Sequence, residues 1–130
     1  MSTPARRVIV TGGASGIGAA IASRLLADGA RVALADPDEQ ALCSWADAPG
    51  ITCLVVDVSD PAALDEALPR VIDDWGGVDV LVNAAGIAGP IALAEDCDPS
   101  EWARCVEVDL VGHFLTARLV IPINSIIFRF

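Results

Sequence analysis

Tyrosine and lysine are both absent from this 130-residue chain, and all eight of its basic residues are arginine. Because 18 acidic residues stand against those eight, the formal net charge is −10 and the isoelectric point is near 4.2. A surface that binds nucleic acid or an anionic membrane needs a basic footprint. The composition therefore predicts neither nucleic acid nor a membrane surface as a partner.

Long apolar runs are also absent. No segment reaches the ~18 consecutive apolar residues of a membrane span, and residues 1–7 lack the apolar stretch of a secretory leader. We therefore expect a cytoplasmic protein. The cysteines show no C-x-x-C spacing, which favours reduced core thiols over disulfides or metal ligands; they are Cys43, Cys53, Cys97 and Cys105.

What the sequence does contain is an alternation of strand-like and helix-like segments. Apolar runs that end on a polar residue predict strands at 8–11, 32–36, 52–57 and 78–83. Helices are predicted at about 17–28, 37–45, 60–75 and 98–120. This alternation is typical of an α/β fold, and right-handed crossovers together with the usual strand order of dinucleotide-binding folds give a parallel sheet of order 3-2-1-4. We expect one domain, residues 1–130, with a truncated, doubly wound, Rossmann-like sheet.

The expected strands deliver small or polar residues to one edge of that sheet. Gly12, Asp36, Asp57 and Asn83 each lie at or just after the end of a strand. Parallel strands share one carboxyl edge, and ligands of open α/β sheets bind there. Helix capping is the alternative interpretation for Asp36 and Asp57.

The segment Thr11-Gly-Gly-Ala-Ser-Gly-Ile-Gly18 follows the first strand and opens the first helix. Glycines at 12 and 16 leave room for the backbone to approach a phosphate, and Gly18 lets the helix lie close to its strand. The first N–H groups of the helix and its dipole attract an anion. We therefore predict a pyrophosphate site at Gly12, Ser15, Gly16, Ile17 and Gly18.

Four motifs in this order and spacing resemble those of the short-chain dehydrogenase/reductase family. They are T-G-x-x-x-G-I-G at 11–18, Asp36 after the second strand, Asp57-Val58 after the third and Asn83-Ala84-Ala85-Gly86 after the fourth. The resemblance covers residues 6–122, which correspond to the cofactor-binding first half of a family member. It implies an NAD-dependent oxidoreductase that transfers hydride between alcohols and carbonyls.

The resemblance also implies which residues meet each part of the dinucleotide: Asp57 and Val58 the adenine, and Asn83, Ala84 and Gly86 the nicotinamide side. A carboxylate at Asp36 can accept both hydrogen bonds from the adenosine ribose and repels a 2′-phosphate, so NAD is expected rather than NADP. Ser15 also favours NAD over NADP, because NADP-preferring relatives often have arginine at that position.

Family members act through a Tyr-x-x-x-Lys pair and an upstream serine, and such proton transfer is typically worth about 10²- to 10⁴-fold. This chain has neither Tyr nor Lys, and the segment around Ser125 does not reproduce the strand that carries the family's serine. We therefore expect nucleotide binding with impaired catalysis, and turnover of an alcohol or carbonyl only if another chain completes the site. The alternatives are a non-catalytic regulatory subunit that pairs with a full-length relative and, with less support, a methyltransferase on a similar fold.

The last predicted helix carries Asp109 at the position of a family asparagine, and His113 four residues later. Both fall near the centre of an apolar stripe that includes Trp102 and Leu110. A hydrogen-bonded Asp–His pair that fills packing space is the favoured interpretation, with proton handling or metal binding as alternatives. Trp102 is expected to be a core anchor.

The fourth strand is expected to lie at the edge of the sheet. Residues 123–130 either add a fifth strand beside it or are an arbitrary ending of a truncated or frame-shifted reading frame. Unpaired apolar edges invite association. We therefore expect a homo- or hetero-oligomer formed through this edge and the last helix.

Overall fold

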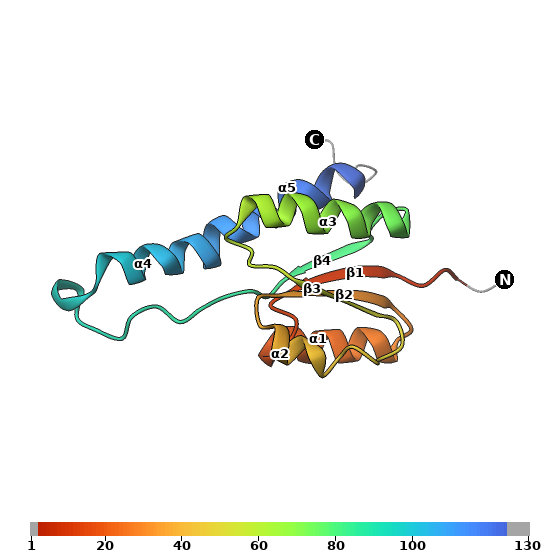
Figure 1. Cartoon of the computed structure of the whole chain (residues 1–130), viewed down its shortest axis with the longest axis horizontal. Coiled ribbons are helices and arrows are strands. Elements are labelled where there is room, and N and C mark those ends of the chain that lie inside the picture. The colour runs from red at the N-terminus through yellow and green to blue at the C-terminus, as the bar shows by residue number, and fades with distance from the viewer. Residues whose placement is uncertain (1–2, 125–130) are drawn as a thin grey trace.

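The computed structural model describes residues 3–124, and its centre is a four-stranded parallel sheet (Figure 1). The strands are β1 (Arg7–Thr11), β2 (Arg31–Asp36), β3 (Ile51–Val55) and β4 (Val80–Asn83). They lie in the order β3-β2-β1-β4, which confirms the predicted order. Val8 of β1 is in register with Val32 of β2 on one side and with Val80 of β4 on the other. The described part of the sheet therefore ends at β4.

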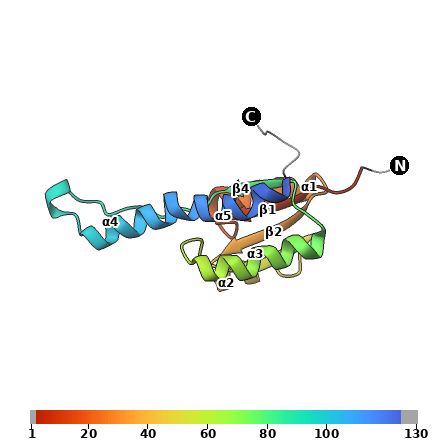
Figure 2. The ribbon, with the colours of Figure 1, turned by 90° about the horizontal axis from the view of Figure 1, so that it is seen from above.

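Helices cover both faces of the sheet, so the fold is an α/β, Rossmann-like, doubly wound arrangement (Figures 1 and 2). One face is covered by α1 (Gly16–Ala27) and α2 (Glu39–Cys43), and the other by α3 (Pro61–Trp75) and α5 (Gly112–Val120). Neighbouring residues of β1 serve different faces: Val8 and Val10 pack with the first group, and Ile9 packs with Leu64 and Leu68 of α3. A strand buried on both faces reads as an unbroken apolar run, which is why the sequence identified it.

Side chains that bond to free backbone N–H groups set the start of three helices. Asp38 accepts from Ala41 N–H at the start of α2, and Asp60 accepts from Ala63 N–H at the start of α3. At the start of α4 (Pro99–Val106), Asp98 accepts from the N–H groups of Ser100 and Glu101. The capping interpretation of Asp36 and Asp57 is therefore wrong, because other aspartates cap the helices that follow them.

The predicted helix 98–120 is interrupted by a π-helical segment, Glu107–Val111, between α4 and α5. Both views show α4 extending beyond the sheet, so little lies beneath it to bury its apolar face. Trp102 is 60 % exposed and Leu110 66 %, and the prediction of a buried stripe with a Trp102 anchor is wrong. The buried positions are Val108, Gly112, Thr116 and Val120.

The remaining expectations have mixed outcomes. All four cysteines are free thiols, but Cys43 is exposed and the other three are only half-buried. Of these, Cys53 packs against the core cluster that includes Leu34 and Leu42, so the expectation of core thiols fits Cys53 alone. Within residues 3–124, no helix is both long and apolar enough to cross a bilayer. Residues 121–124 form a 3₁₀ turn rather than a strand. The rest of the expected fifth strand, together with Ser125, lies outside the described residues.

Candidate dinucleotide site

A cleft of about 380 Å³ opens at the carboxyl ends of the strands. It brings together ten of the eleven predicted cofactor-binding residues: Gly12, Ser15, Gly16, Ile17, Gly18, Asp36, Asp57, Val58, Ala84 and Gly86. These residues come from four separate loops, each following one strand of the sheet. Sequence reasoning missed further lining residues, namely Ala35, Pro37, Asp38, Ala85, Ile87, Arg104 and Val108.

The glycine loop is shaped by close approaches of backbone to backbone. Gly12 has φ +62°, and a Cβ there would lie 2.6 Å from the Cα of Ala85. A Cβ on Gly18 would collide with the carbonyl of Gly12, so only glycine lets α1 start against the loop. Gly16 also has a positive φ, +56°, but a Cβ there would meet no protein atom within 4 Å. The loop is thus a cradle whose open side, at Gly16, faces the cleft.

The start of α1 also faces this cleft. Its N-cap residue, Ser15, makes no side-chain hydrogen bond to the helix. Ser15 and the first helical residues, Gly16, Ile17 and Gly18, all line the cleft. A helix N-terminus presents backbone N–H groups and the positive end of its dipole, so this wall suits an anion such as a phosphate.

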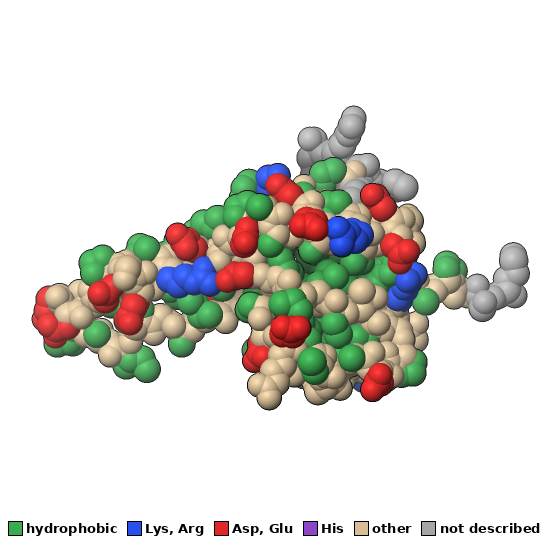
Figure 3. Space-filling model, viewed as in Figure 1, with side chains coloured by type: hydrophobic (Ala, Val, Ile, Leu, Met, Phe, Trp, Pro, Cys, Tyr) green, Lys and Arg blue, Asp and Glu red, His purple; other side chains and the backbone are tan. Residues whose placement is uncertain are grey.

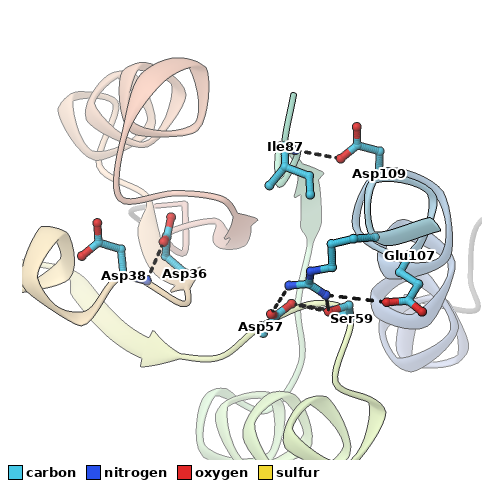
Figure 4. A network of polar contacts seen from close by, with 8 residues as sticks. Asp36, Asp38, Asp57, Ser59, Ile87, Glu107 and Asp109 are labelled. Carbon is cyan, nitrogen blue, oxygen red and sulfur yellow. Dashed lines mark hydrogen bonds and ion pairs between the residues drawn. The ribbon is translucent and has the colours of Figure 1, made fainter. Parts of the chain in front are cut away.

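Asp36 lies at the end of β2 and is 7 % exposed. Its Oδ2 accepts from Ala14 N–H at 3.1 Å and its Oδ1 from Asp38 N–H at 2.9 Å (Figure 4). These bonds fix the carboxylate against the glycine loop. A carboxylate has about four acceptor positions, so each oxygen retains capacity for one more donor, such as a ribose hydroxyl.

Asp57 lies in the loop after β3, two residues beyond the end of a strand that is shorter than predicted. Its Oδ1 accepts from Ser59 N–H at 2.9 Å and Ser59 Oγ at 2.6 Å, and its Oδ2 accepts from Arg104 Nη2 at 2.6 Å. Burial by itself raises the pKa of the Asp57 carboxyl, but the hydrogen bonds from Ser59 and Arg104 outweigh it and hold that pKa below its ordinary value. Asp57 is therefore an ionised acceptor at neutral pH.

Asn83 is the one predicted residue that does not line the cleft. Its side chain points to α5, where Thr116 Oγ1 donates to Asn83 Oδ1 at 2.8 Å and Asn83 Nδ2 donates to the His113 carbonyl at 3.4 Å. The N–H of Ala85 donates to Thr11 Oγ1 at 3.3 Å. Asn83 thus ties β4 to α5, while the residues that follow it form the cleft wall.

Asp109 and His113 do not form the predicted pair. Asp109 Oδ1 accepts from Ile87 N–H at 2.8 Å, whereas His113 Nε2 lies 2.7 Å from the Ala85 carbonyl oxygen. A carbonyl only accepts, so Nε2 carries the proton. The hydrogen bond from Cys105 to the second Asp109 oxygen, at 3.3 Å, raises the pKa of the thiol. Asp109 and His113 therefore hold residues 85–87 against the last helix, each through its own hydrogen bond.

The electrostatic character of the cleft is mixed. Asp36, Asp38 and Asp57 all line it, and Arg104 is the only basic side chain among the lining residues that the structure describes. No group of three or more metal-ligating side chains occurs in the described part of the chain. Phosphates would therefore be held by backbone N–H groups, with acidic side chains left to accept from hydroxyl and amino groups.

A model of the short chain dehydrogenase family matches residues 6–125. The chain belongs to this family. A short chain dehydrogenase/reductase of Macrophomina phaseolina is 35 % identical over 121 residues, covering 88 % of this chain and 69 % of the relative. The 2-dehydro-3-deoxy-L-rhamnonate dehydrogenase (NAD(+)) of Sphingomonas is 36 % identical, covering 90 % of this chain and 47 % of the relative.

The fold of this short-chain dehydrogenase is also found in solved structures. A 3-ketoacyl-(acyl-carrier-protein) reductase of Brucella melitensis, complexed with NADH, has a TM-score of 0.87 and 32 % identity. The alignment covers 94 % of this chain and 51 % of that one. The chain therefore spans about half the length of most of these relatives. Membership of an oxidoreductase family argues against the methyltransferase alternative.

Proposed function

We propose that this chain is a dinucleotide-binding unit of the short-chain dehydrogenase family and that it takes NAD in preference to NADP. The observation that carries the proposal is the convergence of the glycine loop, Asp36 and Asp57 on one cleft at the carboxyl edge of the sheet. The cleft fits the chemistry of a dinucleotide, because the backbone N–H groups at the start of α1 suit phosphates and the fixed carboxylates of Asp36 and Asp57 suit hydroxyl and amino groups.

Each part of the cleft has a separate task in this proposal. The glycine loop and the start of α1 bind the pyrophosphate, and Asp36 accepts from the adenosine ribose hydroxyls. The adenine lies by Asp57 and Val58, and the nicotinamide lies toward Ala84 and Gly86. When bound, the nicotinamide supplies a hydride acceptor or donor. The Asn83 and Asp109 bonds hold the 84–87 wall in place.

Catalysis by this sequence alone is expected to be weak. It contains no tyrosine or lysine to move a proton to or from a substrate oxygen. Asp109 does not replace them, because it is not among the residues that line the cleft, and its oxygens hold Ile87 N–H and the Cys105 thiol. An alcohol or carbonyl substrate is turned over efficiently only when another chain supplies these groups.

A second proposal, a regulatory subunit that pairs with a copy of itself or with a relative, draws on the exposed apolar surface of the α4–α5 arm. Leu110 and Phe114 are 66 % and 65 % exposed, and β4 lies at the edge of the described sheet. Figure 3 shows hydrophobic side chains along this arm, interspersed with acidic ones. Contiguous exposed apolar surface is typical of interfaces.

Calorimetric titration with NAD and NADP tests the cofactor proposal. We expect NAD to bind at least about tenfold more tightly, because the Asp36 carboxylate repels a 2′-phosphate. Asp36→Asn keeps the shape of the side chain but removes its charge, and it should reduce the difference in affinity between NAD and NADP. Asp73→Asn, at an exposed position of α3, is the matched control and should change neither affinity. Tighter binding of NADP by the unsubstituted protein would contradict the proposal.

A further inference from the structure

Arg104 connects α4, which extends beyond the sheet, to the loop after β3. Figure 4 shows Asp57 and Ser59 of that loop and Glu107 on the helix. Its Nη2 donates to Asp57 Oδ2 at 2.6 Å, and its Nη1 donates to Ser59 Oγ. Glu107, one turn further along, lies 3.8 Å from Nη1 and supports the same guanidinium. Arg104 and Asp57 both line the cleft, so this junction forms part of its wall.

The bonds to Asp57 are distributed unequally between its two oxygens. Oδ1 receives both donors of Ser59, and Oδ2 receives only Arg104. With about two acceptor positions on each oxygen, Oδ1 is filled and Oδ2 has one position left. The side chain of Asp57 is 33 % exposed, so that position remains accessible to a ligand in the cleft.

The two Ser59 bonds hold only one oxygen of the carboxylate, because both converge on Oδ1. The χ2 torsion of aspartate has a broad energy profile, so these two bonds restrain the carboxylate only on that side. The bond from Arg104 to Oδ2 adds a restraint on the opposite oxygen, from α4. A fixed acceptor distinguishes a ligand amino group, which donates, from a carbonyl oxygen, which would face it with no hydrogen between them.

We propose that Arg104 is a positioning residue that fixes Asp57 so that the cleft selects a 6-aminopurine over a 6-oxopurine. The inference rests on the proposed function, because it takes the base to lie beside Asp57. It makes α4 part of base recognition although Arg104 need not touch the base. Arg104→Met should therefore reduce discrimination between the bases more than it reduces binding itself.

The test compares NAD with nicotinamide hypoxanthine dinucleotide, which carries a carbonyl oxygen in place of the adenine amino group. In calorimetric titrations, the unsubstituted protein should prefer NAD by about tenfold, and Arg104→Met should bring the ratio below about threefold. Arg104→Lys retains a single charged donor and should restore part of the preference. Arg70→Met removes an exposed ion pair, with Glu66 on α3, away from the cleft and should leave the ratio unchanged.

The pH dependence supplies a readout that a purely structural role would not move. Loss of the Arg104 charge raises the pH at which Asp57 takes up a proton, so the preference for NAD should disappear at a higher pH in Arg104→Met than in the unsubstituted protein.

If the Arg104 variants bind NAD and the hypoxanthine dinucleotide with an unchanged ratio of affinities, this inference is overturned and the proposed function stands. If Arg104→Met increases the ratio, Arg104 contacts the base directly and the inference is again wrong. If the unsubstituted protein binds neither dinucleotide, the proposed function falls together with it.

Discussion

Glycine is required at different positions of the loop after β1 for different physical reasons, although the sequence motif does not distinguish them. Gly12 is constrained twice, by its positive φ and by the backbone of Ala85 beside it. Gly16 is constrained only by its φ. Gly12 therefore allows the loops after β1 and β4 to pack against each other, whereas Gly16 leaves open space at the cleft.

Alanine substitutions at Gly12 and Gly16 should separate the cost of a positive φ from the cost of the close contact with Ala85. Gly16→Ala should lower the free energy of unfolding by about 1 kcal/mol, the cost of a left-handed conformation for a residue with a Cβ. Gly12→Ala should cost about 2 kcal/mol or more, because backbone atoms must also move. Urea denaturation measures both values, and equal losses would show that the contact with Ala85 has no energetic weight.

Asp79, at the opposite end of the sheet from the cleft, provides a prediction about pH. The Arg7 side chain, and then the Arg7 N–H, bond to this carboxylate and lower its pKa to about 2. A carboxyl with a depressed folded pKa stabilises the protein above its unfolded pKa, near 3.8, and that contribution disappears as pH falls toward 2. Asp79→Asn should lower stability at pH 7 by ~1 kcal/mol or less, because the pair is partly exposed to solvent.

The measurement for Asp79 is denaturant unfolding of both proteins at several pH values. The difference between them should be constant from pH 7 to about 5 and should shrink toward zero between about pH 4 and 2. A difference that persists at the acidic limit would assign the stabilisation to packing rather than to charge.

Among the elements, the helix formed by α4, the π-helical segment and α5 changes character along its length. Its second half packs on α3 and β4 through Thr116 and Val120. Its first half extends beyond the sheet, where Trp102 stays exposed. A π-helical turn holds about one more residue than an α-helical turn, so the pattern of buried positions shifts by one residue and cannot be extrapolated from one half to the other.

Loss of an N-cap should have different effects in α4, which extends beyond the sheet, and in α3, which packs in the core. Asp98→Ala removes the acceptor for Ser100 and Glu101 N–H at the start of α4, and amide exchange in 99–106 should accelerate severalfold with little change in the global unfolding midpoint. Asp60→Ala is the comparison, because α3 lies in the core and its loss of a cap should lower the midpoint itself. Exchange measured by mass spectrometry tests both, and a global loss in Asp98→Ala would contradict the picture.

At the scale of the whole molecule, the last helix carries exposed hydrophobic side chains, Leu110 and Phe114 among them, and β4 is the edge strand of the described sheet. We expect the mass in solution, measured by light scattering, to rise with concentration above that of the 13.4 kDa chain. Phe114→Asp should reduce this association without lowering monomer stability, because the side chain is largely exposed. An equivalent substitution at Thr116, which is fully buried, would instead unfold the protein. A single chain mass at every concentration would rule out the interface.

Particular residues show how far sequence reasoning reached. Asp36 and Gly12 could be placed at the cleft because strand ends and tight turns are local properties of the chain. Arg104 could not, because it is 47 positions from Asp57 and only the fold brings the two together. The orientation of Asn83 toward Thr116, rather than into the cleft, likewise depends on how α5 packs.

The sequence by itself determined the strands, the glycine turns and the edge at which a dinucleotide would lie, because apolar periodicity and turn residues act over a few neighbouring positions. The order of the parallel strands followed from right-handed crossovers and from the usual order of dinucleotide-binding folds. The tertiary structure decided what meets across that edge: Arg104 with Asp57, Asp109 with the Ile87 N–H, and His113 with the Ala85 carbonyl. The partners in these contacts are 22 to 47 positions apart in the sequence, so only the packing of distant parts of the chain brings them together.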